Sequence, residues 1–252
     1  MAQKHYDEQF FYTDTYLIKF LSDKLESTLE DLKILEIGCA EGGFIAACIE
    51  KNISVEGLEL EPSRVEIAKK INPNINIQVG DITDEVIFEK FKNDNYDLIV
   101  IRDVIEHITE KNKAIYNMKK LLKVGGYIFI TFPPLYSPFA GHQQNGRTLI
   151  AKIPYIHLLP EVFFKFFANA LNENPSVIED IIFNRSNGIS IKSFYSLCSK
   201  HNLEILDLNL FLIRPVFQIR FGLRTRTFPN IPYLREILAL GCETILKKTK
   251  NG

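Results

Sequence analysis

Residues 33–46 read KILEIGCAEGGFIA, and this stretch decides the fold. An apolar run ends at Ile37, a glycine-rich turn follows from Gly38 to Gly43, and a helical pattern starts at Phe44. A strand, a tight turn and a helix in this order place the backbone N–H groups of a helix N-terminus opposite a bound ligand. The stretch alone fits many nucleotide-binding proteins, so it predicts a ligand loop without identifying the ligand.

Three later segments extend the pattern. The strand expected over Ser54–Leu60 carries Glu59 near its end, 21 residues after Gly38, where a carboxylate can accept hydrogen bonds from both hydroxyls of a ribose. A third strand closes in Gly80 and Asp81, a small residue and an acid beside which a base can lie. Residues 121–130, LLKVGGYIFI, read as a helix end, a Gly-Gly turn and a buried strand.

With these four segments in order, the chain resembles the class I S-adenosylmethionine-dependent methyltransferases over roughly Leu32 to Pro134. The resemblance implies that the glycine-rich loop wraps the methionine end of S-adenosylmethionine, that Glu59 holds the ribose and that Asp81 flanks the adenine. Ala40 stands where many members have a second glycine, which would set the loop slightly farther from the cofactor. The cofactor-binding residues implied are Glu36, Gly38, Ala40, Gly42, Glu59, Leu60, Asp81, Ile82 and Arg102.

Other interpretations of the same residues stay open. Glu59 could be a solvated strand end, and Asp81 could cap the turn that follows it. The sequence from Gly38 to Gly43 also approximates a dinucleotide fingerprint, so an NAD-dependent oxidoreductase is an alternative. A module that binds the cofactor without turnover is a third class, and it would be expected to lack the acids after the fourth strand.

The alternation of helices and strands predicts an α/β fold, a doubly wound and mostly parallel seven-stranded sheet of the Rossmann-like methyltransferase type. The expected strands are Lys33–Ile37, Ser54–Leu60, Ile75–Val79, Tyr96–Ile101, Tyr127–Thr131, Leu203–Phe211 and Val216–Phe221. The expected helices include Leu17–Leu29, Val162–Ala170, Ser190–His201 and a tail over Ile231–Lys250.

The chain reads as one domain, residues 1–252, with an N-terminal helical cap over 1–31 and an insertion over 132–188 after the fifth strand. Substrates enter such sheets beyond the carboxyl ends of central strands, so the insertion is expected to cover the substrate. Its aromatic residues favour a lidded pocket for a small molecule over an open nucleic-acid groove. These residues are Phe132, Tyr136, Phe139, Tyr155 and Phe163.

A second group of polar residues lies in YDLIVIRDVIEHI, residues 96–108. The spacing of Asp103, Glu106 and His107 predicts that all three share one face of a helical turn, and such ligands suit Mg²⁺ or Mn²⁺. The segment resembles the Glu-x-x-Glu-His segment of metal-dependent O-methyltransferases, including the ubiquinone-pathway and small-RNA enzymes. That resemblance implies a further ligand beyond the next strand, for which His142 is the first candidate and His157 the second.

Without a metal, His107 or His142 becomes the candidate general base, because imidazole titrates near neutrality, and Asp103 lines the cofactor pocket. An acid-rich site with imidazoles suits an oxygen acceptor, whose proton must leave. The sequence therefore predicts O-methylation of a hydroxyl on a small polar metabolite, such as a sugar or a phosphorylated compound.

Four arginines lie within thirteen residues near the C-terminal end: Arg214, Arg220, Arg224 and Arg226. They could clamp a phosphate or carboxylate of an anionic substrate. Arginines that alternate with apolar residues are also typical of an exposed strand face, and we favour that interpretation.

The composition agrees with an ordinary globular protein. A hydrophobic fraction of 46% is enough for a core, and a net charge of −1 gives no field to recruit nucleic acid. Four scattered cysteines without a Cys-x-x-Cys pair predict reduced thiols in a cytoplasm. No signal-peptide pattern or membrane-length apolar run is present, so no membrane partner is expected. The oligomeric state stays open.

Overall fold

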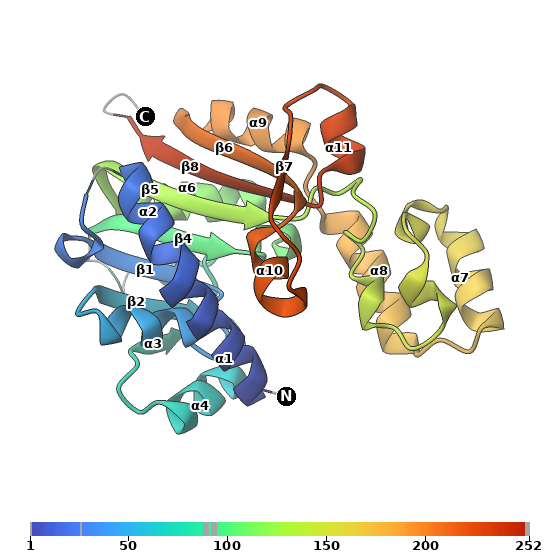
Figure 1. The fold of residues 1–252 in the computed structure, drawn as a ribbon, viewed down its shortest axis with the longest axis horizontal. Helices are drawn as coiled ribbons and strands as arrows, with labels where there is room; N and C mark the ends of the chain where they lie inside the picture. Colours follow the sequence, from blue (N-terminus) through green and yellow to red (C-terminus); the bar gives the residue numbers. More distant parts are fainter. Residues whose placement is uncertain (1, 26, 88–90, 92–94, 250–252) are drawn as a thin grey trace.

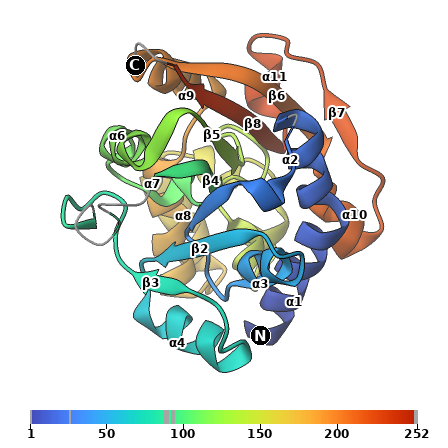
Figure 2. The same ribbon diagram turned by 90° about the vertical axis from the view of Figure 1, so that its left-hand side faces the viewer.

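The computed structural model describes residues 2–25, 27–87, 91 and 95–249. Its centre is a sheet with the strand order β3-β2-β1-β4-β5-β8-β6-β7, covered by helices on both faces (Figures 1 and 2). Pairs from β3 to β5 are parallel, and the remaining pairs are antiparallel. The predicted fold class is confirmed, with eight strands rather than seven in the described part of the chain. The strands are β1 (Lys33–Ile37), β2 (Ser54–Glu59), β3 (Ile77–Val79), β4 (Tyr96–Arg102), β5 (Leu122–Phe132), β6 (Leu203–Ile213), β7 (Arg226–Phe228) and β8 (Gly241–Lys248).

The central strands are apolar on both faces because helices cover both. Ile34 and Leu35 are neighbours on β1 and belong to two different buried clusters. The cluster of Ile34 includes side chains of α1 to α4, and that of Leu35 includes side chains of α6 and α9. The helices are α1 (Ala2–Tyr12), α2 (Ile18–Leu25), α3 (Gly43–Glu50), α4 (Pro62–Ile71), α6 (Lys111–Leu121), α7 (Glu161–Ala170), α8 (Pro175–Asn187), α9 (Ile191–Lys200), α10 (Pro215–Phe221) and α11 (Leu234–Leu238).

The N-terminal segment differs from the single helix predicted over Leu17–Leu29. A π-helical turn over Thr13–Leu17 joins α1 to α2, and a 3₁₀ turn follows at Leu29–Asp31. The helix α1 packs tightly on the start of α3. The absence of a side chain at Gly43 permits this contact, since a Cβ atom there would lie 2.3 Å from the carbonyl oxygen of Tyr6. The first helix therefore lies directly beside the glycine-rich loop.

Two predictions for the C-terminal part are wrong. The segment Val216–Phe221, predicted as a strand, belongs to α10, because Pro215 at the first helical position has the φ that starts a helix. In the tail predicted as helical from Ile231, the five residues of α11 are helical and β8 is a strand. Six successive residues of β8 are buried between β5 and β6, so the tertiary environment overrides local propensity.

Residues 132–188 leave the sheet after β5 and form a lobe that contains α7 and α8 (Figure 1). The lobe has a small apolar cluster of its own, and α8 packs against the 3₁₀ turn Ile105–His107 that follows β4. Short 3₁₀ turns in the lobe span Gln143–Asn145, Leu149–Lys152 and Ile156–Leu158. Among the helices of the described residues, none is long and apolar enough to cross a membrane.

Glu243 on β8 should make stability depend on pH. Tyr16 donates its hydroxyl to Glu243 at 3.0 Å, and burial raises the pKa of this carboxyl to about 7. Because the folded-state pKa lies above the unfolded value, this contribution is present at acidic pH and is lost as pH rises toward 7. Glu243→Gln should therefore be more stable than wild type by up to about 3 kcal/mol at pH 8 and nearly equal at pH 5. Urea unfolding at both pH values measures this, and an equal difference at both would contradict it.

Candidate active site

A cavity of about 1360 Å³ lies at the carboxyl ends of the parallel strands, lined by the sheet, the lobe and α10. A pocket for one drug-sized ligand measures roughly 300–1000 Å³, so this cavity has room for a cofactor and an acceptor together. Five of the predicted cofactor-binding residues line it: Gly38, Glu59, Leu60, Asp81 and Ile82.

The glycine-rich turn requires left-handed backbone at three positions. Gly38, Ala40 and Gly42 have φ values of 69°, 50° and 79°. A Cβ atom at Gly38 would lie 2.4 Å from a methyl group of Val104, so a larger residue would displace Val104, which follows β4. Ala40 adopts a conformation that glycine adopts at lower cost, so its departure from the family pattern strains the loop. Gly42 precedes α3 as its N-cap and lines neither of the two cavities described here.

Glu59 fixes the glycine-rich loop from the end of β2. Its Oε2 accepts the N–H of Ala40 at 2.8 Å, and its Oε1 accepts the N–H of Glu61 at 3.0 Å. It is buried and lines the cavity, so it is not a solvated strand end, and its oxygens retain capacity for further hydrogen bonds. Asp81 both lines the cavity and caps a turn, because its Oδ1 accepts the N–H of Thr83 at 2.7 Å.

A smaller cavity of about 180 Å³ shares part of its lining with the first, and Glu36, Ala40 and Arg102 line it. Arg102 donates to Oε1 of Glu36 at 2.6 Å. Burial raises the pKa of Glu36 to about 7, although Arg102 opposes the shift. Oε2 of Glu36 and Nε of Arg102 are buried without a partner in the described structure. An unpartnered acceptor and an unpartnered donor fit a ligand that carries both an ammonium and a carboxylate group.

The structure does not bring Asp103 to the other predicted ligands. Asp103 has a φ of 53°, and the helical turn that follows is only the 3₁₀ turn Ile105–His107, so the three side chains do not share a helical face. Arg214 donates to both carboxylate oxygens of Asp103, at 2.6 and 2.8 Å, and Thr131 donates its hydroxyl at 3.2 Å. Burial opposes ionisation, but Arg214 outweighs it and lowers the pKa of Asp103. Asp103 is therefore a fixed anion where the two cavities adjoin.

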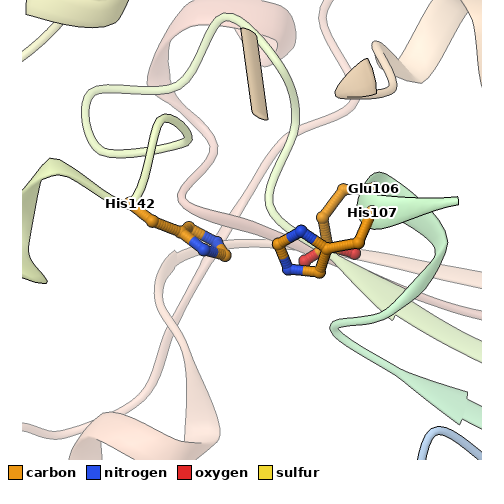
Figure 3. Close-up of side chains that lie close together, drawn as sticks. All are labelled: Glu106, His107 and His142. Atoms are coloured by element: carbon orange, nitrogen blue, oxygen red, sulfur yellow. The ribbon is translucent and has the colours of Figure 1, made fainter. Parts of the chain in front are cut away.

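Glu106, His107 and His142 converge, and one ligand atom from each lies within 4.8 Å of the others (Figure 3). Glu106 and His107 belong to the turn after β4, whereas His142 comes from the lobe, with a φ of 57°. The imidazole centroids lie 5.0 Å apart. Both oxygens of Glu106 are buried, and neither has a hydrogen-bond partner among the described residues. Two imidazoles beside an unsatisfied buried carboxylate fit a divalent cation.

The pKa shifts in this cluster favour the metal-binding forms of the imidazoles. Burial lowers the pKa of His107, and it lowers that of His142 to about 4, with the neighbouring His107 adding to the effect. Both rings are therefore neutral at pH 7, which is the form that binds a metal. Burial, with a smaller effect of Asp103, raises the pKa of Glu106 well above its usual value, and a nearby cation would favour its ionised form.

The remaining predicted residues lie apart from this cluster. His157, the second candidate ligand, is buried in the lobe and donates from Nε2 to the carbonyl oxygen of Leu135 at 2.9 Å. The four arginines do not share a strand face, because Arg214 precedes α10, Arg220 lies within it and Arg226 begins β7. Arg220 pairs with Glu8 at 2.9 Å, and Arg220, Arg224 and Arg226 are exposed.

Three contributions to the site have no local signal in the sequence. Arg214 reaches Asp103 from far along the chain. His5 pairs with Glu41 and lines both cavities, although it lies in a polar N-terminal segment. Asn184 is buried in α8 beside Ile178 and Ile181, although it is one of several polar residues in that helix.

Comparison with known families gives a match over most of the chain. A family model described as a methyltransferase domain matches residues 6–208. This range contains β1 to β5, the glycine-rich turn, the converging ligands and the lobe, and it ends before Arg214.

Curated relatives match more briefly. The ubiquinone biosynthesis O-methyltransferase of Coxiella burnetii (strain Dugway 5J108-111) is 26% identical over 118 residues, which cover 45% of this chain and 48% of that protein. The malonyl-[acyl-carrier protein] O-methyltransferase of Paenibacillus sp. (strain JDR-2) is 30% identical over 151 residues, 52% of this chain and 55% of that protein. The chain thus spans about half the length of the curated relatives it matches.

Solved structures share the fold. The crystal structure of the plantazolicin methyltransferase BamL in complex with a triazolic desmethylPZN analog and SAH has a TM-score of 0.61. The match covers 99% of this chain and 90% of that one at 12% identity. At this identity the likeness concerns the fold alone.

Proposed function

The chain belongs to the class I S-adenosylmethionine-dependent methyltransferases, and we propose that it methylates a hydroxyl of a small polar metabolite with the help of a divalent cation. The observation that carries this proposal is the convergence of Glu106, His107 and His142, two of which line the cavity that the predicted cofactor-binding residues also line. A cofactor and an acceptor held in one cavity can react in line without diffusing together.

The residues around the glycine-rich turn would hold the cofactor. Glu59 would accept hydrogen bonds from the ribose, and Asp81, which lines the same cavity at the next strand end, would lie beside the adenine. The ion pair of Glu36 and Arg102 has a free acceptor and a free donor for the amino-acid end. S-adenosylmethionine would supply a methyl group on a positively charged sulfur: the carbon–sulfur bond would break as the carbon–oxygen bond forms, S-adenosylhomocysteine would leave, and the hydroxyl proton of the acceptor would pass to water.

The donor set of the metal site is two imidazole nitrogens and one carboxylate, because Asp103 is paired with Arg214. This set favours Mn²⁺, Zn²⁺ or Fe²⁺ over Mg²⁺, and we propose Mn²⁺ first. Such a cation supplies a Lewis acid that lowers the pKa of the acceptor hydroxyl. A metal-free reaction with His142 as base is a weaker alternative, since a pKa of about 4 makes this imidazole a poor proton acceptor.

The cavity lining favours an uncharged acceptor, such as a sugar, over a phosphorylated one. Carboxylates outnumber guanidinium groups in the lining, and two of the three guanidinium groups are already paired with acids. Such a lining attracts a cationic cofactor and repels an anionic acceptor. The charged residues that line it are Glu59, Glu61, Asp81, Asp103, Glu110, Arg64, Arg214 and Arg220. Phenyl rings and amides complete it, including Phe139, Phe183, Phe217, Gln144 and Asn145.

We also propose a cytoplasmic location. All four cysteines are buried and unpaired, which suits a reducing compartment. Besides the cofactor, we propose a small-molecule acceptor as the binding partner of this site.

Removal of divalent metal tests the proposed chemistry. After exhaustive EDTA treatment, release of S-adenosylhomocysteine with a panel of sugars and their phosphate esters is expected to fall about 100-fold or more, because the acceptor loses its Lewis acid. Mn²⁺ should restore turnover, and Mg²⁺ should restore less. Full activity in the metal-free enzyme would contradict the metal and leave His107 as the general base, whereas tight NAD binding would favour an oxidoreductase.

A further inference from the structure

Asn184 lies at the contact between the lobe and the sheet. It belongs to α8, which packs on the 3₁₀ turn that carries Glu106 and His107, and its side chain is 4% exposed. Its Nδ2 donates to the carbonyl oxygen of Gly141 at 3.4 Å. The same carboxamide therefore touches the backbone directly before His142, the ligand that the lobe contributes.

The other end of the carboxamide is not used within the lobe. Oδ1 of Asn184 is buried and accepts no hydrogen bond of ordinary length from the described residues. Burial lowers the pKa of His107, and the neighbouring side chain of Asn184 partly opposes that shift. The geometry points the same way, because Oδ1 is a buried acceptor without a partner on the helix that packs on the turn of His107. A ligating histidine usually donates its second ring N–H to such an oxygen.

The turn that carries His142 is held in place by close contacts. A Cβ atom at Gly141 would lie 2.4 Å from Cβ of His157, so glycine is needed there. Gln143 donates to the carbonyl oxygen of Pro138 at 2.7 Å, and contacts of this kind hold the left-handed φ of His142 in place. Strained backbone of this kind gathers at functional positions. Asn184 adds the contact that joins this turn to His107.

We propose, on the basis of the proposed function, that Asn184 is a positioning residue that holds His107 and His142 at the separation a divalent cation requires. Oδ1 orients the ring of His107, and Nδ2 holds the carbonyl group next to His142. The two ligands belong to different parts of the fold, so this one side chain couples the seating of the lobe to the assembly of the site.

Mn²⁺ binding to the cofactor-free protein tests the proposal by calorimetry, without an acceptor or turnover. Asn184→Leu keeps the branched shape at a somewhat larger volume and removes both the donor to Gly141 and the acceptor proposed for His107, so Mn²⁺ affinity should fall about 10- to 100-fold. Asn184→Asp keeps an acceptor for His107 but loses the Nδ2 donor to Gly141, so its Mn²⁺ affinity should lie between those of wild type and the Leu variant, within about tenfold of wild type. Affinity for S-adenosylmethionine should stay unchanged in both variants.

Asn187, at the end of the same helix and only partly buried, provides the matched control, and Asn187→Ala should bind Mn²⁺ like wild type. If wild type binds Mn²⁺ and Asn184→Leu binds it equally well, the positioning role is overturned while the metal proposal stands. If the Leu and Asp variants lose affinity equally, the residue only packs the helix and the proposal is overturned. Wild-type protein that binds no Mn²⁺ would overturn the metal proposal and this one together.

Discussion

Glu106→Gln should lose about 100-fold or more in Mn²⁺ affinity and in turnover, while the fold remains intact. Both oxygens of Glu106 are buried and unpartnered in the described structure, so the carboxylate has no other evident role. An amide of the same shape removes the charge that a cation needs. Because a neutral amide is easier to bury than a carboxylate, the metal-free variant should be at least as stable as wild type.

Asp103→Asn is the informative comparison for Glu106→Gln. Asp103 lies in the same segment, but its carboxylate is paired with Arg214 and lies outside the converging cluster. Its Mn²⁺ affinity should therefore stay within about threefold of wild type. Calorimetry with Mn²⁺ and chemical unfolding of both variants separate ligand loss from misfolding. Equal losses in the two variants would show that Asp103 moves into the cluster when the metal binds, against the geometry described here.

The parallel half of the sheet could be predicted because each of its strands is a short apolar run bounded by turn residues. The C-terminal half could not be predicted in this way. The sequence of β8, GCETILKK, mixes polar and apolar residues, and it becomes a strand because β5 and β6 leave a position between them. The local pattern of polar and apolar residues cannot predict this pairing, since β5 and β6 lie far from β8 and from each other in the sequence.

In the candidate site, too, some residues could be predicted from the sequence and others could not. Glu59, Asp81 and the glycine-rich turn follow from strand order, because the carboxyl ends of parallel strands meet at one edge. The pairing of Asp103 with Arg214 joins residues 111 positions apart, and no spacing rule predicts it. Nor does helical spacing apply at Asp103, since its left-handed φ breaks the turn before it begins. Such strain belongs to positions where tertiary contacts dictate the backbone.

Glu59→Ala should weaken S-adenosylmethionine binding about 10- to 100-fold, which corresponds to the loss of charge-assisted hydrogen bonds to the ribose. The structure adds a second reason for a large effect. The carboxylate also accepts the N–H groups of Ala40 in the glycine-rich turn and of Glu61 before α4, so its removal leaves two backbone donors without their partner. Calorimetry with S-adenosylmethionine and with S-adenosylhomocysteine measures the loss.

The glycine-rich loop gives a reason why Glu59→Ala should lose more cofactor affinity than the ribose contacts alone would account for. Ala40 is held at a φ of 50°, which an alanine adopts at a cost of roughly 1–2 kcal/mol, and the bond to Glu59 helps to hold it there. Ala40→Gly in the Glu59→Ala background removes that strain and should recover part of the lost affinity. Glu61→Ala, a neighbouring acid of the same cavity, is the control and should change binding by less than about threefold. Unchanged binding in Glu59→Ala would mean that the ribose lies elsewhere, and the cofactor orientation proposed here would have to be abandoned.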